Sequence, residues 1–223
     1  VANIIRNNVV GVRTSIADPA QALGFVGDSA TRPNQIQDNA TGIVMTGALI
    51  QSQVLRGNAV GASGSGQIGS DTLARANLFE RNTTGVTGFT GTLQFNRFSA
   101  NVTAIDAASE QRVLHNLFYG NTAVGVLVSS KTDVRVFNNT FYAPAGDNLR
   151  VVGGSAEVEA QNNLMWSMQG YNLFVDNASR FGFYSDYNVL YTSGAGKLGF
   201  WTKDFLDIVD WQADLARFDL HSI

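Results

Sequence analysis

The chain has no cysteine, only three prolines and two histidines, and charged residues make up only 15% of its 223 positions. The absence of cysteine excludes disulfides, thiol nucleophiles and thiolate metal sites. No apolar run is long enough to cross a membrane as a helix. The net charge is −3 and no cluster of lysine or arginine occurs, so we expect neither a nucleic-acid partner nor a membrane span.

What the chain has instead is a repeated phrase, N-x-Φ-x-x-N-x-x-G-Φ, where Φ is apolar. It is clearest from Asn3 to Val12 and from Asn77 to Val86. Looser copies begin mostly about 20–25 residues apart, a period typical of stacked structural repeats. These copies start at Asn34, Gln53, Asn96, Asn116, Asn139, Asn163 and Asn188.

Within each repeat the apolar residues alternate in short bursts, as in Val126-Leu-Val128 and Val134-Arg-Val136. Bursts of three to five residues that end at Gly, Asn, Asp or Ser are typical of strands and turns. The pattern predicts an all-β fold, a parallel β-helix (solenoid) of about eight to nine coils over residues 1–200. Several strands in each repeat, with no helical period between them, lead to this interpretation.

The repeat positions predict columns of stacked side chains. The third position should form an internal apolar column, and the tenth position a second one. We expect the sixth-position asparagines to occupy sharp turns, to adopt the left-handed backbone there, and to hydrogen-bond between repeats. The third-position residues are Ile5, Ile36, Leu55, Phe79, Phe98, Phe118, Phe141, Met165 and Leu190.

These units resemble the right-handed parallel β-helix superfamily, specifically the repeat shared by pectate-lyase-like and mannuronan-epimerase-like bacterial proteins. The units at Asn77, Asn96 and Asn116 carry the resemblance, together with Asn138-Asn-Thr-Phe141. It implies a right-handed coil, polysaccharide as the partner, and a secreted or cell-surface bacterial location. The chain starts inside a repeat, so we also expect neighbouring domains of a longer exported protein.

Residues 201–223 depart from the repeat. Thr202 is the expected N-cap of a helix with Asp204 in its first turn. Trp201, Phe205, Ile208 and Leu215, joined by Val209 or Trp211, are spaced for one apolar face. We interpret this segment as a helical cap over the last coil, or as a docking face for another domain, followed by the start of a truncated extension. Ser185–Tyr191 and Asp219–Ile223 also resemble the closing section of large secreted β-helix proteins.

No catalytic motif is recognised, and the catalytic residues are unknown at this stage. The acidic residues are scattered, so calcium or another cofactor has no predicted ligand cluster. His115 precedes a repeat asparagine and is expected to fill a corner, and His221 is expected to be unconstrained. Glu157 and Glu159 have the spacing of paired carboxylates, but we interpret them as solvated charges on an outer strand.

The fourth repeat position ends in four aromatic residues, Tyr119, Tyr142, Trp166 and Tyr191. The third position points inward, so the fourth should point outward. Stacked at about 4.8 Å, these aromatic side chains match the length of a sugar unit and suit its apolar faces. They are the predicted substrate-binding residues, with mutual structural stacking as the alternative role.

Two segments, residues 14–33 and the Gly/Ser-rich residues 61–72, are expected to be long loops that either bind or merely decorate the solenoid. The preferred hypothesis is a non-catalytic module of an exported bacterial protein that engages polysaccharide along an outer face. The alternatives are a lyase, epimerase or hydrolase acting on uronate-type glycans, and a structural surface-array or adhesin segment.

Overall fold

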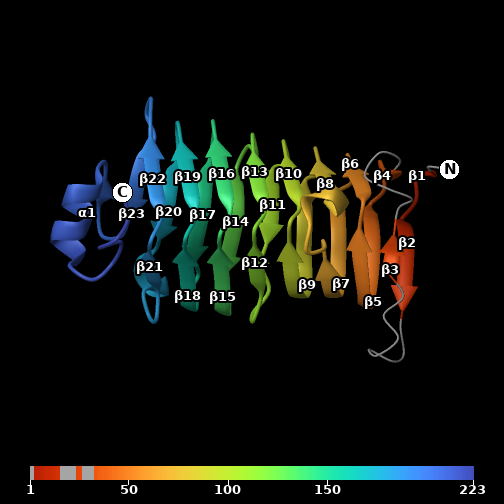
Figure 1. Cartoon of the computed structure of the whole chain (residues 1–223), viewed down its shortest axis with the longest axis horizontal. Helices are drawn as coiled ribbons and strands as arrows, with labels where there is room; N and C mark the ends of the chain where they lie inside the picture. The colour runs from red at the N-terminus through yellow and green to blue at the C-terminus, as the bar shows by residue number, and fades with distance from the viewer. Residues whose placement is uncertain (1–2, 16–23, 27–32) are drawn as a thin grey trace.

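The computed structural model describes residues 3–15, 24–26 and 33–223. It is predominantly β, with two mostly parallel sheets and one short α-helix near the C-terminus. The elements follow one another along the long axis of the molecule, from β1 near the N-terminus to α1 at the opposite end (Figure 1). Most of the 14–33 segment lies outside the described residues, and its predicted role as a long loop stays a prediction.

The first sheet has nine parallel strands of three or four residues, one from each repeat. Their registers align the same repeat position in every strand, so Ile36 lies beside Leu55 and Phe98 beside Phe118. The order is β1 (Ile4–Arg6), β4 (Asn34–Gln37), β6 (Gln53–Arg56), β8 (Leu78–Glu80), β10 (Arg97–Ser99), β13 (Leu117–Tyr119), β16 (Thr140–Ala143), β19 (Leu164–Ser167) and β22 (Val189–Thr192).

The second sheet contains longer strands that later divide. The first half of β9 pairs with β11, and its second half pairs with β12, so one strand continues as two lines of short strands. The members are β2 (Val10–Ser15), β3 (Gly24–Val26), β5 (Thr41–Gln51), β7 (Val60–Ile68), β9 (Thr84–Gln94), β11 (Thr103–Asp106), β12 (Arg112–Leu114), β14 (Val124–Ser129), β15 (Thr132–Phe137), β17 (Asp147–Val152), β18 (Ala156–Gln161), β20 (Tyr171–Val175), β21 (Tyr184–Asp186), β23 (Lys197–Phe200) and β24 (Asp204–Phe205).

Both predicted columns lie in the interior, which confirms that prediction, and the second half of the second sheet adds further buried residues such as Ile68, Leu93 and Val113. The third-position residues pair along the whole first sheet, and those from Ile36 to Leu190 are buried. Burial of each such side chain contributes roughly 1.5–3 kcal/mol. The rings of Phe79, Phe98, Phe118 and Phe141 stack face to face, with successive centroids 4.8, 5.0 and 4.4 Å apart.

The sixth-position asparagines form the expected hydrogen-bonded ladder. The Oδ1 atom of Asn101 accepts from the backbone and side-chain nitrogens of Asn82, both at 2.9 Å, and Asn101 donates in turn to Asn121. The expected left-handed backbone at these asparagines is wrong. The residue just before each turn asparagine adopts it, as at Asp38, Arg81 and Ala100, with φ of 55°, 53° and 54°. The asparagine is thereby free to bond between repeats.

The expected loop over residues 61–72 is also wrong, because most of it is strand β7, which pairs with β5 and β9. Glycine is poor in strands by propensity, but here neighbouring backbones come very close. A Cβ atom on Gly64 would lie 1.8 Å from the carbonyl oxygen of Met45, and φ at Gly64 is 118°. The glycines therefore permit a strand, and only the 3₁₀ helix η2 (Leu73–Arg75) that follows projects outward.

Helix α1 (Ile208–Leu215) starts later than predicted. Its N-cap is Asp207, which accepts from the backbone of Asp210, so the expected Thr202 cap is wrong. Phe205 belongs to the short strand β24, which pairs antiparallel with β23. Trp211 is buried, and its ring fills the space that a Cβ on Gly199 would need. Trp211 and Phe205 thus belong to the apolar interior, Ile208 and Leu215 pack against it, and Val209 stays exposed. The predicted role of this segment as a cap stays a prediction.

Candidate functional site

The aromatic row, defined as Tyr119, Tyr142, Trp166 and Tyr191, lies on the outer face of the first sheet. The four residues are direct neighbours in successive strands. Their relative exposures are 37%, 37%, 36% and 56%, respectively, which confirms that they point outward. No observation tests whether they bind sugar, so this role stays a prediction.

The rings of the row do not form one flat stack. Tyr142 and Trp166 have centroids 4.8 Å apart with planes at 54°, and Trp166 meets Tyr191 nearly edge-on at 5.5 Å. The indole Nε1 of Trp166 donates to Ser193 Oγ at 2.9 Å, which fixes the ring. Tyr142, Trp166 and Tyr191 are therefore ordered by contacts with one another and with Ser193, while part of each ring stays open to solvent.

A second outward row runs beside the first, because the second repeat position lies on the same strand face as the fourth. It includes Leu117, Thr140, Leu164 and Val189, and the last two are exposed apolar residues. Arg97 is the one charged member of this row, which reads Ile4, Gln35, Val54, Leu78, Arg97, Leu117, Thr140, Leu164 and Val189. Beside the aromatic row, this second row thus offers apolar surface together with the cation of Arg97.

Two neighbouring pockets, together called the groove, hollow this face at the N-terminal end of the aromatic row. The larger pocket has a volume of about 450 Å³ and the smaller about 170 Å³, and both are lined by Leu73 of η2 and by Arg97. Tyr119, a member of the aromatic row, also lines the larger pocket. The larger pocket is lined by Leu73, Phe95, Arg97, His115, Asn116, Leu117, Tyr119, Asn138 and Thr140.

His115 occupies the corner predicted for it. Its φ is 54°, and its ring stacks on Phe95 with centroids 4.8 Å apart and planes within 8°. The exposed Asn138 occupies the same corner in the next repeat. The corner residues border the groove.

The sequence analysis did not single out Arg97. The signal that could have revealed it is the second repeat position, because alternation along the strand places that position on the same outward face as the fourth.

The paired carboxylates do not form an isolated pair. Glu159 lies 3.9 Å from Arg135, which itself lies 3.5 Å from Asp133, and Arg112 contacts Asp133 at 3.0 Å. Glu157 instead has a left-handed backbone with φ of 55°, which interrupts the regular alternation of the strand. The structure therefore assigns Glu159 to a row of surface ion pairs, called here the ionic row: Arg112, Asp133, Arg135 and Glu159.

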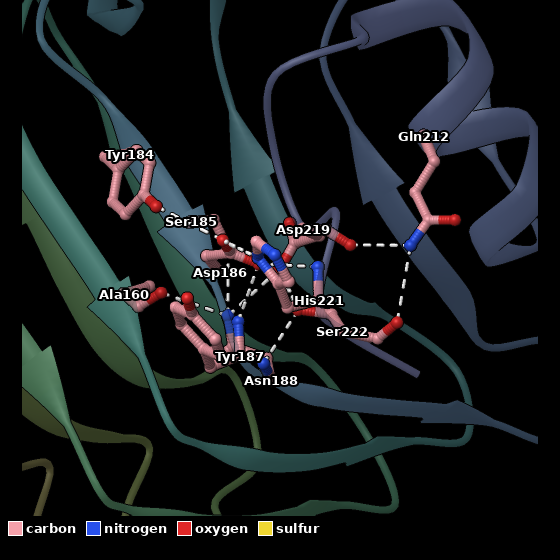
Figure 2. Close-up of polar contacts among 10 residues, drawn as sticks. All are labelled: Ala160, Tyr184, Ser185, Asp186, Tyr187, Asn188, Gln212, Asp219, His221 and Ser222. Atoms are coloured by element: carbon pink, nitrogen blue, oxygen red, sulfur yellow. Dashed lines mark hydrogen bonds and ion pairs between the residues drawn. The ribbon is translucent and has the colours of Figure 1, made fainter.

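His221 is not unconstrained, so that expectation is wrong. Figure 2 shows residues 219–222 lying against the Tyr184–Asn188 segment, where the chain returns to the first sheet. Asp186 accepts from the His221 backbone at 2.9 Å and lies 2.8 Å from His221 Nδ1. The His221 ring also stacks on Tyr187 at 4.8 Å. Tyr187 and His221 thus form a stacked pair like Phe95 and His115, and Tyr187 occupies the same repeat position as those two corner residues.

A second carboxylate, Asp219, is fully buried in this cluster and accepts from four donors, three of which are drawn in Figure 2 (Ser185, Asn188 and Ser222). They are Ser185 Oγ, Asn188 Nδ2, Ser222 Oγ and Trp211 Nε1, at 2.9, 3.0, 2.7 and 2.9 Å. Both serine hydroxyls therefore donate to Asp219. Among the described residues of this cluster, neither serine hydroxyl is hydrogen-bonded to His221. The Asp219 carboxylate instead links β21, α1 and residues 219–222, called here the returning segment.

The two buried acids of the cluster have opposite pKa directions. Burial raises the pKa of Asp219 above its ordinary value, although the hydrogen bonds from Asn188, Ser222 and Ser185 oppose it. Burial also acts to raise the pKa of Asp186, but hydrogen bonds from His221 and the Tyr187 backbone outweigh it and the pKa is lowered. Of these two acids, therefore, only Asp186 is ionised more readily in the folded chain than at its ordinary pKa.

Within the described ranges, no group of three or more His, Asp or Glu side chains is arranged to hold a metal ion. None of the helices among those residues is both long and apolar enough to cross a membrane. No family model matches the chain, and neither a curated protein nor a solved structure is found to be similar to it.

Proposed function

We propose that this chain is a non-catalytic module that engages a polysaccharide along the outer face of the first sheet. The observation that carries the proposal is the exposed aromatic row, with one ring in each of four successive strands. Adjacent parallel strands are about 4.8 Å apart, which is close to the length of one pyranose unit. A glycan that lies along the molecule meets one ring per sugar.

The fold proposed for this module is the right-handed parallel β-helix, in the class of the pectate-lyase-like and mannuronan-epimerase-like repeats. The one-strand-per-repeat order of the first sheet and the uniform registers support it. Such a scaffold keeps the outer residues at fixed spacing, because the columns beneath them are packed. A rigid row pays little ordering entropy when a long polymer binds.

The individual ring contacts suit a sugar. Tyrosine and tryptophan present an apolar face and a polar tip, so a ring gives contact area and a hydrogen bond together. Leu164 and Val189 extend the apolar surface beside Trp166 and Tyr191. The proposed setting is a secreted or cell-surface bacterial protein, since extended polysaccharides of this kind are encountered there.

A glycan-array screen tests the proposal, with uronate polymers included and with calcium present or absent. Each hit is then incubated with the protein and followed for the absorbance of an unsaturated lyase product. We expect binding without product. Product formation would replace the proposal with the lyase alternative, and silence on the whole array would remove polysaccharide as the partner.

A further inference from the structure

The groove beside the aromatic row is lined by two side chains that can carry positive charge, Arg97 and His115. None of its described lining residues is acidic. Arg97 is exposed and makes no ion pair with another described residue, whereas Arg56, Arg112 and Arg150 each contact a carboxylate within 3.0 Å. A cation that no described residue pairs with, at the junction of two pockets, is available to a ligand.

The residues around Arg97 are apolar, which favours a charge contact with a ligand. Its register neighbours are Leu78 and Leu117, and Leu73 borders both pockets with it. Apolar neighbours lower the local dielectric, so a charge contact gains more there than on an open surface. The guanidinium presents paired donors whose fork matches the oxygens of a carboxylate, sulfate or phosphate.

Neutral donors complete the larger pocket. The Asn138 amide, the Thr140 hydroxyl and the Tyr119 hydroxyl come from its lining, and the His115 ring is held flat against Phe95. Tyr119 belongs both to the pocket and to the aromatic row. A polymer that follows the row therefore reaches the groove without leaving the sheet face.

The geometry points to a glycan that carries oxyanion groups: the groove holds one such group at Arg97 and His115 while the aromatic row holds the sugar rings. This inference rests on the proposed function and specifies its ligand class. The expected preference for an anionic glycan does not come from a general attraction of polyanions, because the chain as a whole carries a net charge of −3.

The test compares four celluloses on one backbone: hydroxyethyl, carboxymethyl, sulfated and phosphorylated. Isothermal titration at low salt should show at least one anionic form binding about tenfold more tightly than the neutral form. This preference should shrink as salt is added. The three anionic arms also show which oxyanion the groove selects.

Arg97→Gln should bring the favoured anionic form to the level of the neutral one, while binding of hydroxyethyl cellulose stays unchanged. Arg217→Gln, which removes an exposed arginine beyond α1, serves as the matched control and should retain the preference. Equal binding of neutral and anionic forms, or an unaltered preference in Arg97→Gln, would refute the inference. So would equally tight binding of single-stranded DNA, or no binding of any cellulose.

The row variant Tyr142→Ala/Trp166→Ala separates this inference from the proposed function. If that variant abolishes binding of every cellulose while Arg97→Gln changes nothing, the function stands and the inference fails. If Arg97→Gln alone abolishes the anionic preference and the row variant is silent, the groove stands and the proposed role of the row fails.

Discussion

The outer faces of the two sheets differ although the same packed interior supports both. On the second sheet, the ionic row pairs its own charges, Arg112 with Asp133 and Arg135 with Glu159. On the first sheet, the aromatic row leaves its rings open, and Arg97 has no described ion-pair partner. The first sheet also has an ion pair, Arg56 with Glu80, but it lies outside the aromatic row. Charges that pair with each other are not available to a ligand, so we assign the proposed binding to the aromatic row and Arg97.

The difference shows how a repeat divides its positions. Inward positions are fixed by packing, because a change of one methylene group is felt in a close-packed interior. Outward positions have no such constraint and are the ones on which the proposed binding depends. The following changes test this division, from the largest expected effect to the smallest.

Phe118→Ala should break the interior that both faces share. The Phe118 ring lies 5.0 Å from Phe98 and 4.4 Å from Phe141, so truncation opens a cavity in the stack. The free energy of unfolding should fall by about 3–5 kcal/mol, as measured by urea denaturation. The neighbouring outward variant Tyr119→Ala is the control, and an equal loss in both would contradict the division.

Asn101→Ala should weaken the corner that joins the two faces. The change removes the acceptor of two bonds from Asn82 and the donor to the Phe79 carbonyl, all buried. Leaving such groups unpaired should lower the free energy of unfolding by about 1–3 kcal/mol. Val102→Ala, at an exposed neighbouring position, should unfold like the wild type. If Asn101→Ala did so too, the ladder would have no stabilising role.

Acid should loosen the returning C-terminal segment through Asp186. Its pKa is lowered in the folded chain, so its stabilisation is present above the ordinary value of 3.8 and is lost as pH falls through the folded value. Asp219, with a raised pKa, acts in the opposite direction: its contribution is greatest below 3.8 and declines as pH rises through its folded value. Fluorescence of the buried Trp211 follows the change.

The variant Asp186→Asn separates the contribution of Asp186 to the pH dependence of stability from that of Asp219. The variant should flatten the acid side of the stability profile, because the group that must be protonated is absent. Leu206→Ala, which truncates an exposed side chain near the same end, should keep the wild-type profile. An unchanged acid limb in Asp186→Asn would show that other carboxylates set it.

Ser193→Ala should produce the smallest effect, confined to the aromatic row. The hydroxyl accepts from Trp166 Nε1 at 2.9 Å and orients the indole without belonging to the row. Glycan affinity should fall about threefold, with stability nearly unchanged, since a partly exposed hydrogen bond contributes little. Restoration of affinity by Ser193→Thr would show that the hydroxyl positions the ring, and unchanged affinity in Ser193→Ala would contradict that role.

The interior was predictable because its signal is repeated. Phe79, Phe98 and Phe118 recur at one repeat position with period-two alternation, and alternation alone determines which side faces inward. The C-terminal segment was harder. Asp207 and Thr202 are both acceptable N-caps by residue type, and the choice between them depends on the pairing of Phe205 in β24.

The candidate site was only half predictable. The exposure of the aromatic row follows from alternation, but the groove arises where Arg97, a corner residue and Leu73 of η2 meet. That meeting depends on the strand β7, whose glycines look like a loop by propensity. Contacts between His221 and Asp186 likewise require the return of the chain after α1, which no local pattern encodes.

The most direct test of the central claim is a calorimetric titration of the strongest array glycan into three proteins. They are the wild type, Tyr142→Ala/Trp166→Ala on the first sheet, and Arg112→Ala/Arg135→Ala on the second. The account predicts that the aromatic variant loses at least about tenfold in affinity while the ionic variant binds like the wild type. Equal losses in both variants, or full affinity in the aromatic variant, would contradict it.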